Sequence, residues 1–132
     1  MTLIVDTSVA LKWYASEDQT EQADAVLRHE LAAPDLIVAE ICNALLKKVL
    51  RREMDERAVG DVLPHLRRSI HLLPTAPLAE VALQIALELR HPAYDCFFLA
   101  AAEQLDLELT TADARLVRAC RDTRHEARVR LL

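Results

Sequence analysis

Four acidic residues lie where a carboxylate could do chemistry, and three of them are aspartates. Asp6 directly follows the apolar run Leu3–Val5, and Asp113 comes shortly after the run Leu107–Thr110. Both runs predict buried strands of a parallel sheet, and the reactive crevice of such a sheet lies beyond the carboxyl ends of its strands. Asp95 stands at the predicted start of a helix, where its carboxylate faces the positive end of the helix dipole. We therefore expect these acids to converge.

Glu40 is the fourth acid, and its surroundings are the most unusual. It lies in the apolar run Leu36–Cys42, with no lysine or arginine within one turn on either side. A charge inside a mostly buried helix is unfavourable unless it is paired, solvated in a cleft or bound to a metal. The alternative is an exposed glutamate on a polar stripe with Asn43 and Lys47. The three aspartates also have a simpler explanation, because aspartate is a favoured N-cap of helices.

Carboxylates that are brought together repel one another, and this repulsion restricts their chemistry. It is relieved either by raised pKa values or by a bound divalent cation. Carboxylate oxygens and water suit Mg²⁺ or Mn²⁺. Such an ion can lower the pKa of a bound water, hold a phosphate oxygen and stabilise the leaving oxygen. The four acids therefore predict hydrolysis of a phosphodiester by a metal-activated water.

The charge distribution indicates where an anionic substrate would be held. The formal net charge is −5, but residues 114–132 carry six arginines against two acids. The planar guanidinium of arginine matches phosphate well. This arginine-rich end is therefore expected to hold phosphates beside the acidic cluster. The alternative is a solvated helix face followed by a terminal strand.

Length and composition place the chain among ordinary globular proteins. Its 132 residues, 52% hydrophobic and 28% charged, are expected to form a single domain over residues 1–132. The only glycine, Gly60, excludes glycine-rich nucleotide loops. No apolar run approaches the roughly 20 residues that cross a bilayer, and no leader is evident, so we expect a cytoplasmic protein that does not enter membranes. The three cysteines are far apart and predict reduced core thiols.

Alternating strand and helix patterns predict one α/β domain around a five-stranded parallel sheet. The predicted strands are Leu3–Val5, Leu31–Ala33, His71–Leu73, Leu107–Thr110 and Ala127–Leu131. Helices are predicted after Asp6, at Glu21–Glu30, at Leu36–Arg52, at Asp55–Ser69 with a kink or break at Pro64, from Pro77 to Leu89, at Asp95–Leu105 and at Asp113–Arg121.

Four segments, taken in order, resemble those of PIN-domain nucleases, and more narrowly of VapC-like toxin ribonucleases from toxin–antitoxin pairs. They are Val5–Ser8 with Lys12–Trp13, Glu40–Asn43, Tyr94–Ala100 and Thr110–Asp113. Each segment alone is a weak signal, whereas the ordered set is fairly specific. The resemblance spans most of the chain and implies a PIN-like three-layer sandwich with the sheet between helices.

The resemblance also implies roles for individual residues in a Mg²⁺- or Mn²⁺-dependent endoribonuclease. Asp6, Glu40, Asp95 and Asp113 would be the catalytic, metal-binding residues, and Ser8, Asn43 and Thr111 would surround them. Candidates for contact with the RNA substrate are Lys12, Arg115 and Arg118. Arg115 stands where many relatives carry a further acid, which puts a fifth carboxylate in doubt. The implied partners are a cognate antitoxin and a second copy in a homodimer, or a larger hetero-oligomer with the antitoxin.

Other interpretations of the acids were weighed against this one. A haloacid-dehalogenase-type phosphatase needs a second aspartate two residues after the first, where this chain has Ser8. A receiver domain needs a lysine after its last strand, but the only lysines are Lys12, Lys47 and Lys48. A non-toxin RNA-processing nuclease and a non-catalytic binding module of the same fold remain alternatives. The apolar face of Leu36–Leu50, with Trp13 and Tyr14, is either core or an antitoxin contact.

Overall fold

A five-stranded, entirely parallel sheet forms the centre of the computed structural model, which describes all 132 residues. The strands are β1 (Thr2–Val5), β2 (Glu30–Pro34), β3 (Ile70–Leu73), β4 (Leu109–Thr111) and β5 (Val129–Leu131). Their order across the sheet is β3-β2-β1-β4-β5. The predicted α/β fold with five parallel strands is confirmed.

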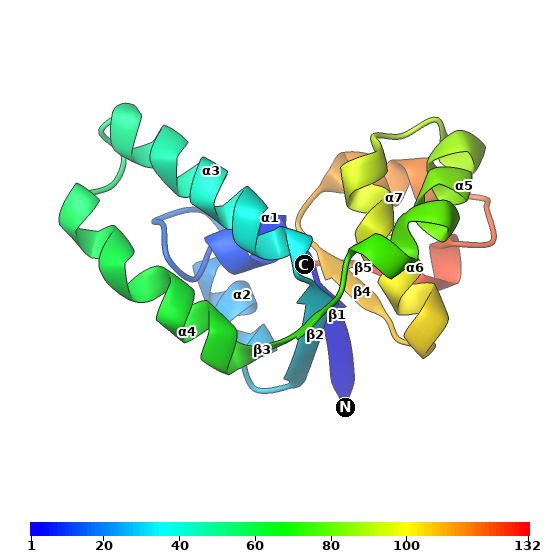
Figure 1. Ribbon diagram of the computed structural model, residues 1–132, viewed down its shortest axis with the longest axis horizontal. Coiled ribbons are helices and arrows are strands. Elements are labelled where there is room, and N and C mark those ends of the chain that lie inside the picture. Colours follow the sequence, from blue (N-terminus) through cyan, green and yellow to red (C-terminus); the bar gives the residue numbers. More distant parts are fainter.

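Helices cover both sides of this sheet, as Figure 1 shows. The helices are α1 (Thr7–Leu11), α2 (Thr20–Val26), α3 (Leu36–Leu50), α4 (Val62–Ser69), α5 (Ala79–Leu89), α6 (Ala93–Leu105) and α7 (Ala114–Cys120). Short 3₁₀ segments are η1 (Glu56–Asp61), η2 (Ala76–Leu78) and η3 (Glu126–Arg128). Helices α3 and α4 project as an arm on one side, and α5, α6 and α7 gather in a lobe on the other. None of these helices has the length and apolar character that a membrane span requires.

Two predicted element boundaries were wrong, and in both cases tertiary hydrogen bonding overrode the local pattern. Glu30 was expected to end a helix, but it pairs with Thr2 in the β1–β2 ladder. Leu107 was expected to begin a strand, but its N–H donates to the Ala102 carbonyl and closes α6. Asp106 makes that closure possible by adopting a left-handed conformation with φ of 53°.

The predicted helix over Asp55–Ser69 is divided into η1 and α4, and the division precedes Pro64. Helix α4 begins at Val62, so Pro64 lies in its first turn. The missing N–H of proline costs nothing there, because first-turn N–H groups have no partner within the helix. The expected break therefore occurs, but Pro64 belongs to the start of the new helix.

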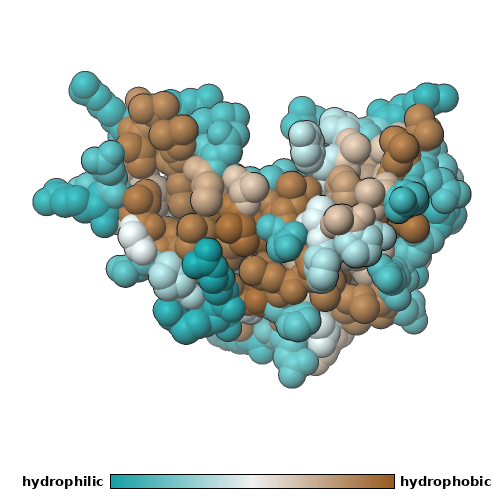
Figure 2. Space-filling model, viewed as in Figure 1, coloured by the Kyte–Doolittle hydropathy of each residue, from teal (hydrophilic) through white to brown (hydrophobic).

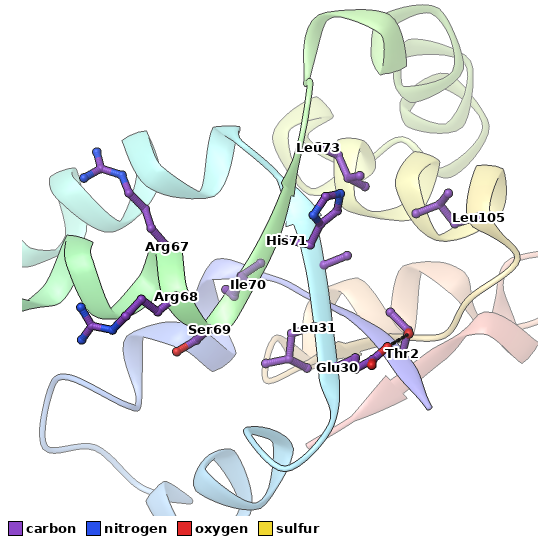
Figure 3. Close-up of a pocket in the computed structure, with 11 residues that line it drawn as sticks. Thr2, Glu30, Leu31, Arg67, Arg68, Ser69, Ile70, His71, Leu73 and Leu105 are labelled. Carbon is purple, nitrogen blue, oxygen red and sulfur yellow. Dashed lines mark hydrogen bonds between the residues drawn. The ribbon is translucent and has the colours of Figure 1, made fainter.

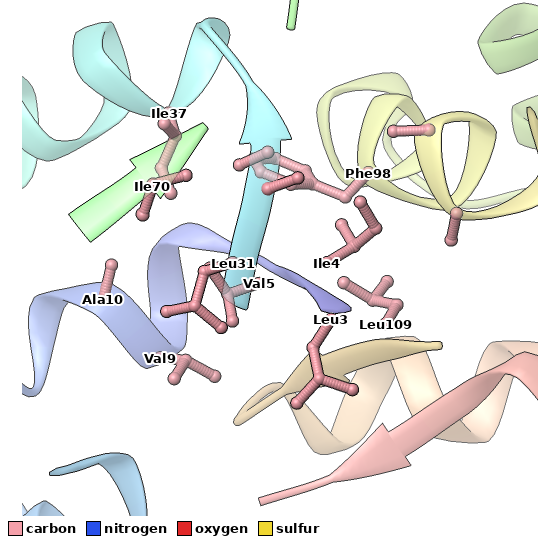
Figure 4. Close-up of a cluster of buried hydrophobic side chains, with 14 of the residues drawn as sticks. Leu3, Ile4, Val5, Val9, Ala10, Leu31, Ile37, Ile70, Phe98 and Leu109 are labelled. Carbon is pink, nitrogen blue, oxygen red and sulfur yellow. The ribbon is translucent and has the colours of Figure 1, made fainter. Parts of the chain in front are cut away.

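A single cluster of 29 buried residues forms the hydrophobic core between the layers. Ile4, Val5 and Leu109 contribute from the central strands, and Phe98 packs against them from α6 (Figure 4). Cys96 and Cys120 are buried free thiols, as predicted. The same prediction was wrong for Cys42, which is exposed on α3.

The neighbouring positions of β1 and β4 matter most for the candidate site. Ile4 pairs with Leu109, and Val5 pairs with Thr110, so the two strands end together. Asp6 and Thr111 are the next residues along each chain. Parallel pairing thus brings two segments about a hundred residues apart to the same end of the sheet.

Phe98→Ala tests the position of the core. Phe98 is 1% exposed, and its truncation should lower the free energy of unfolding by about 3–5 kcal/mol, measured by urea denaturation. Leu87→Ala is the control, because Leu87 is 57% exposed and its loss should cost less than about 0.5 kcal/mol. Equal losses in the two variants would contradict the packing described.

Candidate metal centre

Asp6 occupies the turn from β1 into α1, and its carboxylate is almost fully buried at 5% exposure. It caps α1 by accepting a hydrogen bond of 3.3 Å from the Val9 N–H. The Ser8 hydroxyl donates to Oδ1, and the Thr111 hydroxyl donates to Oδ2, each over 2.5 Å. Both carboxylate oxygens are therefore held in place by hydroxyl groups.

Ser8 and Thr111 are themselves held by the backbone that follows β4. The Ala112 N–H donates to Ser8 Oγ over 2.9 Å, and the Asp113 N–H donates to Thr111 Oγ1 over 3.0 Å. Each hydroxyl thus accepts from the backbone and donates to Asp6. This network couples the start of α1 to the end of β4 and leaves little freedom in the orientation of Asp6.

Burial and a neighbouring charge act on the two acids that lack a basic partner. Burial raises the pKa of Asp6 to about 6, although the Ser8 and Thr111 hydroxyls oppose the shift. Burial also raises the pKa of Glu40, which accepts a hydrogen bond of 2.8 Å from Thr7. The negative charge of Asp95 raises the pKa of both groups further. Acids carried by the β1–α1 turn, α3 and α6 therefore influence one another electrostatically.

Asp95 and Asp113 form a closer group with a histidine. Asp95 lies in the first turn of α6, and its Oδ2 is 2.7 Å from His91 Nε2. Asp113 caps α7 by accepting from the Arg115 N–H over 2.9 Å. One potential ligand atom from each of His91, Asp95 and Asp113 lies within 4.8 Å of the other two. Asp6 and Glu40 fall outside this tight group.

Sequence reasoning missed His91, which was noted only as the residue where a helical pattern stops. The available signal was its position four residues before Asp95. Asn43, predicted to surround the cluster, is exposed on α3 one turn after Glu40. Of the two aspartate caps, Asp6 and Asp113 also face the proposed chemistry, whereas Asp95 makes no cap hydrogen bond.

The basic residues nearest the cluster differ in how free their charges are. Arg115 is 81% exposed, and its Nε lies 3.7 Å from Asp113. Arg118 is exposed in the last turn of α7 and forms no ion pair. Lys12 instead donates to the Asp18 carbonyl over 2.8 Å, so its ammonium is engaged by a neighbouring loop. Arg118 is thus the most available cation of the three.

The expectation that the whole arginine-rich end would face a phosphate was wrong for its last three members. Arg124 contacts Glu88 and Glu103, Arg128 pairs with Asp106 over 3.2 Å, and Arg130 pairs with Glu108 over 3.5 Å. Asp106 and Glu108 precede β4, so these pairs lie toward the amino end of the sheet. Acids of the same chain already neutralise these guanidinium groups.

The donor chemistry of the cluster fits a divalent cation. Asp6 and Glu40 are partly or fully buried, and neither forms an ion pair with lysine or arginine. Carboxylates in this situation gain most from a bound cation of higher charge. Oxygen donors favour hard ions such as Mg²⁺ and Mn²⁺.

The largest hollow of the protein lies elsewhere. A hollow of about 700 Å³ runs along β2 and β3, with Leu73, His71 and Leu105 around it (Figure 3). Arg67 and Arg68 border this hollow, but Figure 3 shows their guanidinium groups pointing away from the two strands. Its lining contains one acid, Glu30, and lacks the convergent polar groups of the cluster. The outline of the molecule is also notched between the α3 arm and the α5–α7 lobe (Figure 2).

Comparisons with known proteins agree on one family. The family model described as PIN domain matches residues 3–122. Ribonuclease VapC3 from Pyrobaculum aerophilum is 32% identical over 121 residues, which cover 88% of this chain and 92% of that protein. Ribonuclease VapC1 from Mycobacterium tuberculosis is 36% identical over 92 residues, covering 66% of this chain and 65% of that protein.

Solved structures share the fold. The crystal structure of PAE2754 from Pyrobaculum aerophilum superimposes with a TM-score of 0.72 at 26% identity, covering 93% of this chain and 87% of that one. A toxin–antitoxin complex from Klebsiella pneumoniae gives a TM-score of 0.69 at 14% identity, covering 97% of this chain and 95% of that one. The second likeness is one of fold alone.

Asp6→Asn tests the burial of this carboxylate without metal. The unfolded chain ionises Asp6 near pH 3.8, whereas the folded chain keeps the proton until a pKa of about 6. The cost of burying the charge therefore develops between these pH values and is fully present above them. In EDTA at pH 8, Asp6→Asn should raise the free energy of unfolding by about 1–3 kcal/mol relative to the parent.

The comparison is made by urea denaturation at pH 8 and pH 4. At pH 4 the difference between Asp6→Asn and the parent should largely vanish, because the parent carboxyl is then mostly protonated when folded. Asp24→Asn, on the exposed side of α2, should show no such change. A stabilisation by Asp6→Asn that is the same at both pH values would exclude the ionisation of Asp6 as its cause.

Proposed function

This chain belongs to the PIN domain family, and from that premise we propose that it is a metal-dependent endoribonuclease and the toxin of a toxin–antitoxin pair. The observation that carries the proposal is the convergence of Asp95 with Asp113, beside Asp6 and Glu40, which have no basic partners. The relatives named ribonuclease VapC support RNA as the substrate. A ribonuclease of this kind would act in the cytoplasm as a single domain over residues 1–132.

Asp6, Glu40, Asp95 and Asp113 are the proposed ligands of Mg²⁺ or Mn²⁺. When bound, the ion would supply positive charge for the phosphate and lower the pKa of the attacking water. Ser8 and Thr111 orient Asp6 through their hydroxyl hydrogen bonds. Thr7 holds Glu40 in the same way, and Asn43 stands one turn further along α3.

Hydrolysis by water requires no covalent intermediate with the protein. In-line attack on the phosphorus would leave a 3′-hydroxyl and a 5′-phosphate. Arg118 is the side chain best placed to contact a flanking phosphate, because it is exposed and unpaired on the helix that Asp113 caps. Arg115 would assist after leaving its 3.7 Å contact with Asp113. Lys12 is a weaker candidate, because its ammonium is engaged by Asp18 and Glu17.

The arm formed by α3 and α4 is the proposed antitoxin contact. A groove of about 280 Å³ separates α3 from η1 and α4, and its lining is almost entirely apolar. Leu46, in this groove, is 54% exposed, and Leu50 is 72% exposed. The toxin–antitoxin complex among the structural neighbours supports a partner of this kind. Trp13 and Tyr14 have internal roles instead, since they bond to Ala23 and His65.

A homodimer, alone or within a larger hetero-oligomer with the antitoxin, is the proposed assembly. Helix α5 leaves three apolar side chains exposed that a second copy could cover. They are Val81, Leu83 and Leu87. An RNA-processing nuclease of the same family is the alternative function, and the two differ in their effect on a growing cell.

Asp113→Asn tests the proposed catalysis. Asparagine keeps the cap of α7 and nearly the same volume but removes one ligand charge. Cleavage of a labelled RNA in Mg²⁺ or Mn²⁺ should slow by at least about 100-fold, the order lost when one charge-stabilising group leaves an active site. EDTA should abolish cleavage by the parent. Asp55→Asn is the matched control, because Asp55 also caps a helical segment but lies on η1.

Activity of Asp113→Asn equal to that of the parent would contradict this role. Cleavage that persists after exhaustive chelation would exclude the metal mechanism.

Expression of the chain alone tests the toxin role. We expect growth arrest on induction, because free ribonuclease would degrade cellular RNA, and we expect Asp6→Asn to relieve it. Growth is followed by optical density and viable counts. Normal growth with active, soluble parent protein in the cells would favour the RNA-processing alternative.

A further inference from the structure

His91 is held beside the acidic cluster by the tight connection between α5 and α6. Arg90 ends α5 in a left-handed conformation with φ of 51°, and the His91 N–H donates to the Ala86 carbonyl over 3.3 Å. Pro92 is extended and caps the start of α6. The His91 side chain is only 11% exposed. The imidazole therefore has a defined place at the base of α6.

The polar neighbours of the His91 ring are acids. Its Nε2 lies 2.7 Å from Asp95 Oδ2, and Asp113 Oδ approaches from the separate turn between β4 and α7. The three donor atoms lie within 4.8 Å of one another. Donors that share one cation at about 2.1 Å lie at most about 4.2 Å apart, so small side-chain rotations suffice to close this group on an ion.

A purely structural His91–Asp95 pair would explain the 2.7 Å contact but not the third member. Asp113 reaches the pair from another element, and no lysine or arginine of the chain contacts Asp95. A cation would replace the proton shared between the imidazole and Asp95, since metal ligands bind in their deprotonated forms.

We propose that His91 is a direct ligand of the divalent cation, together with Asp95 and Asp113. This inference rests on the metal centre of the proposed function and specifies which cation that centre prefers. Mg²⁺ takes oxygen donors almost exclusively, whereas imidazole nitrogen suits first-row transition-metal ions. One nitrogen among carboxylates therefore shifts the preference of the site from Mg²⁺ toward Mn²⁺.

Electron spin-echo envelope modulation of Mn²⁺ added to the full-length, metal-free protein tests this ligand directly. Coordinated imidazole nitrogen produces ¹⁴N modulation that water and carboxylate do not. The parent should show it, and His91→Asn should lose it. His29→Asn should keep it, because His29 is exposed just before β2, at the amino end of the sheet. Labelling the parent with ¹⁵N-histidine should convert the signal, which tests the ligand without any substitution.

Calorimetric titration with Mn²⁺ and Mg²⁺ provides the second measurement. His91→Asn should weaken Mn²⁺ binding by at least about tenfold, while Mg²⁺ binding changes by less than about threefold. Bound Mn²⁺ without nitrogen modulation in the parent, or modulation that survives in His91→Asn, would overturn the role of His91 and leave the proposed metal centre standing. A parent that binds neither ion would overturn both.

Discussion

Repulsion among carboxylates at the carboxyl end of the sheet is the constraint on which the site depends. Asp6 and Glu40 have no lysine or arginine partner, and the charge of Asp95 raises the pKa of both. Folding thus brings like charges together in a region that water solvates poorly. Such an arrangement is unfavourable for the protein alone, and it becomes favourable when a cation joins it.

The hydroxyl network around Asp6 makes this arrangement tolerable in the folded chain. Ser8 and Thr111 each donate to one carboxylate oxygen, and the backbone after β4 fixes both hydroxyls. These bonds favour the ionised form and oppose the effect of burial. They also orient the carboxylate from two separate elements, so the geometry does not depend on a single flexible side chain.

Charges of opposite sign are separated along the strands. Acids converge beyond the carboxyl ends of β1 and β4, whereas Arg124, Arg128 and Arg130 are neutralised by acids toward the amino end. These three arginines join α5, α6 and the loop before β4 to the C-terminal segment. Only Arg118 and Arg115, on α7, remain exposed close to Asp113. The basic end of the chain therefore has two physical roles, which its composition does not distinguish.

The sequence by itself determined the α/β class, the parallel sheet and the residues worth examining, because hydrophobic periodicity and an unpaired acid such as Glu40 are local signals. It also indicated Ser8 and Thr111, through the family resemblance. Only the tertiary structure decided that His91 joins Asp95 and Asp113, and that Leu107 closes a helix instead of starting a strand. The reason is that proximity across the sheet depends on strand order and on how each turn closes, and neither is encoded within a single segment.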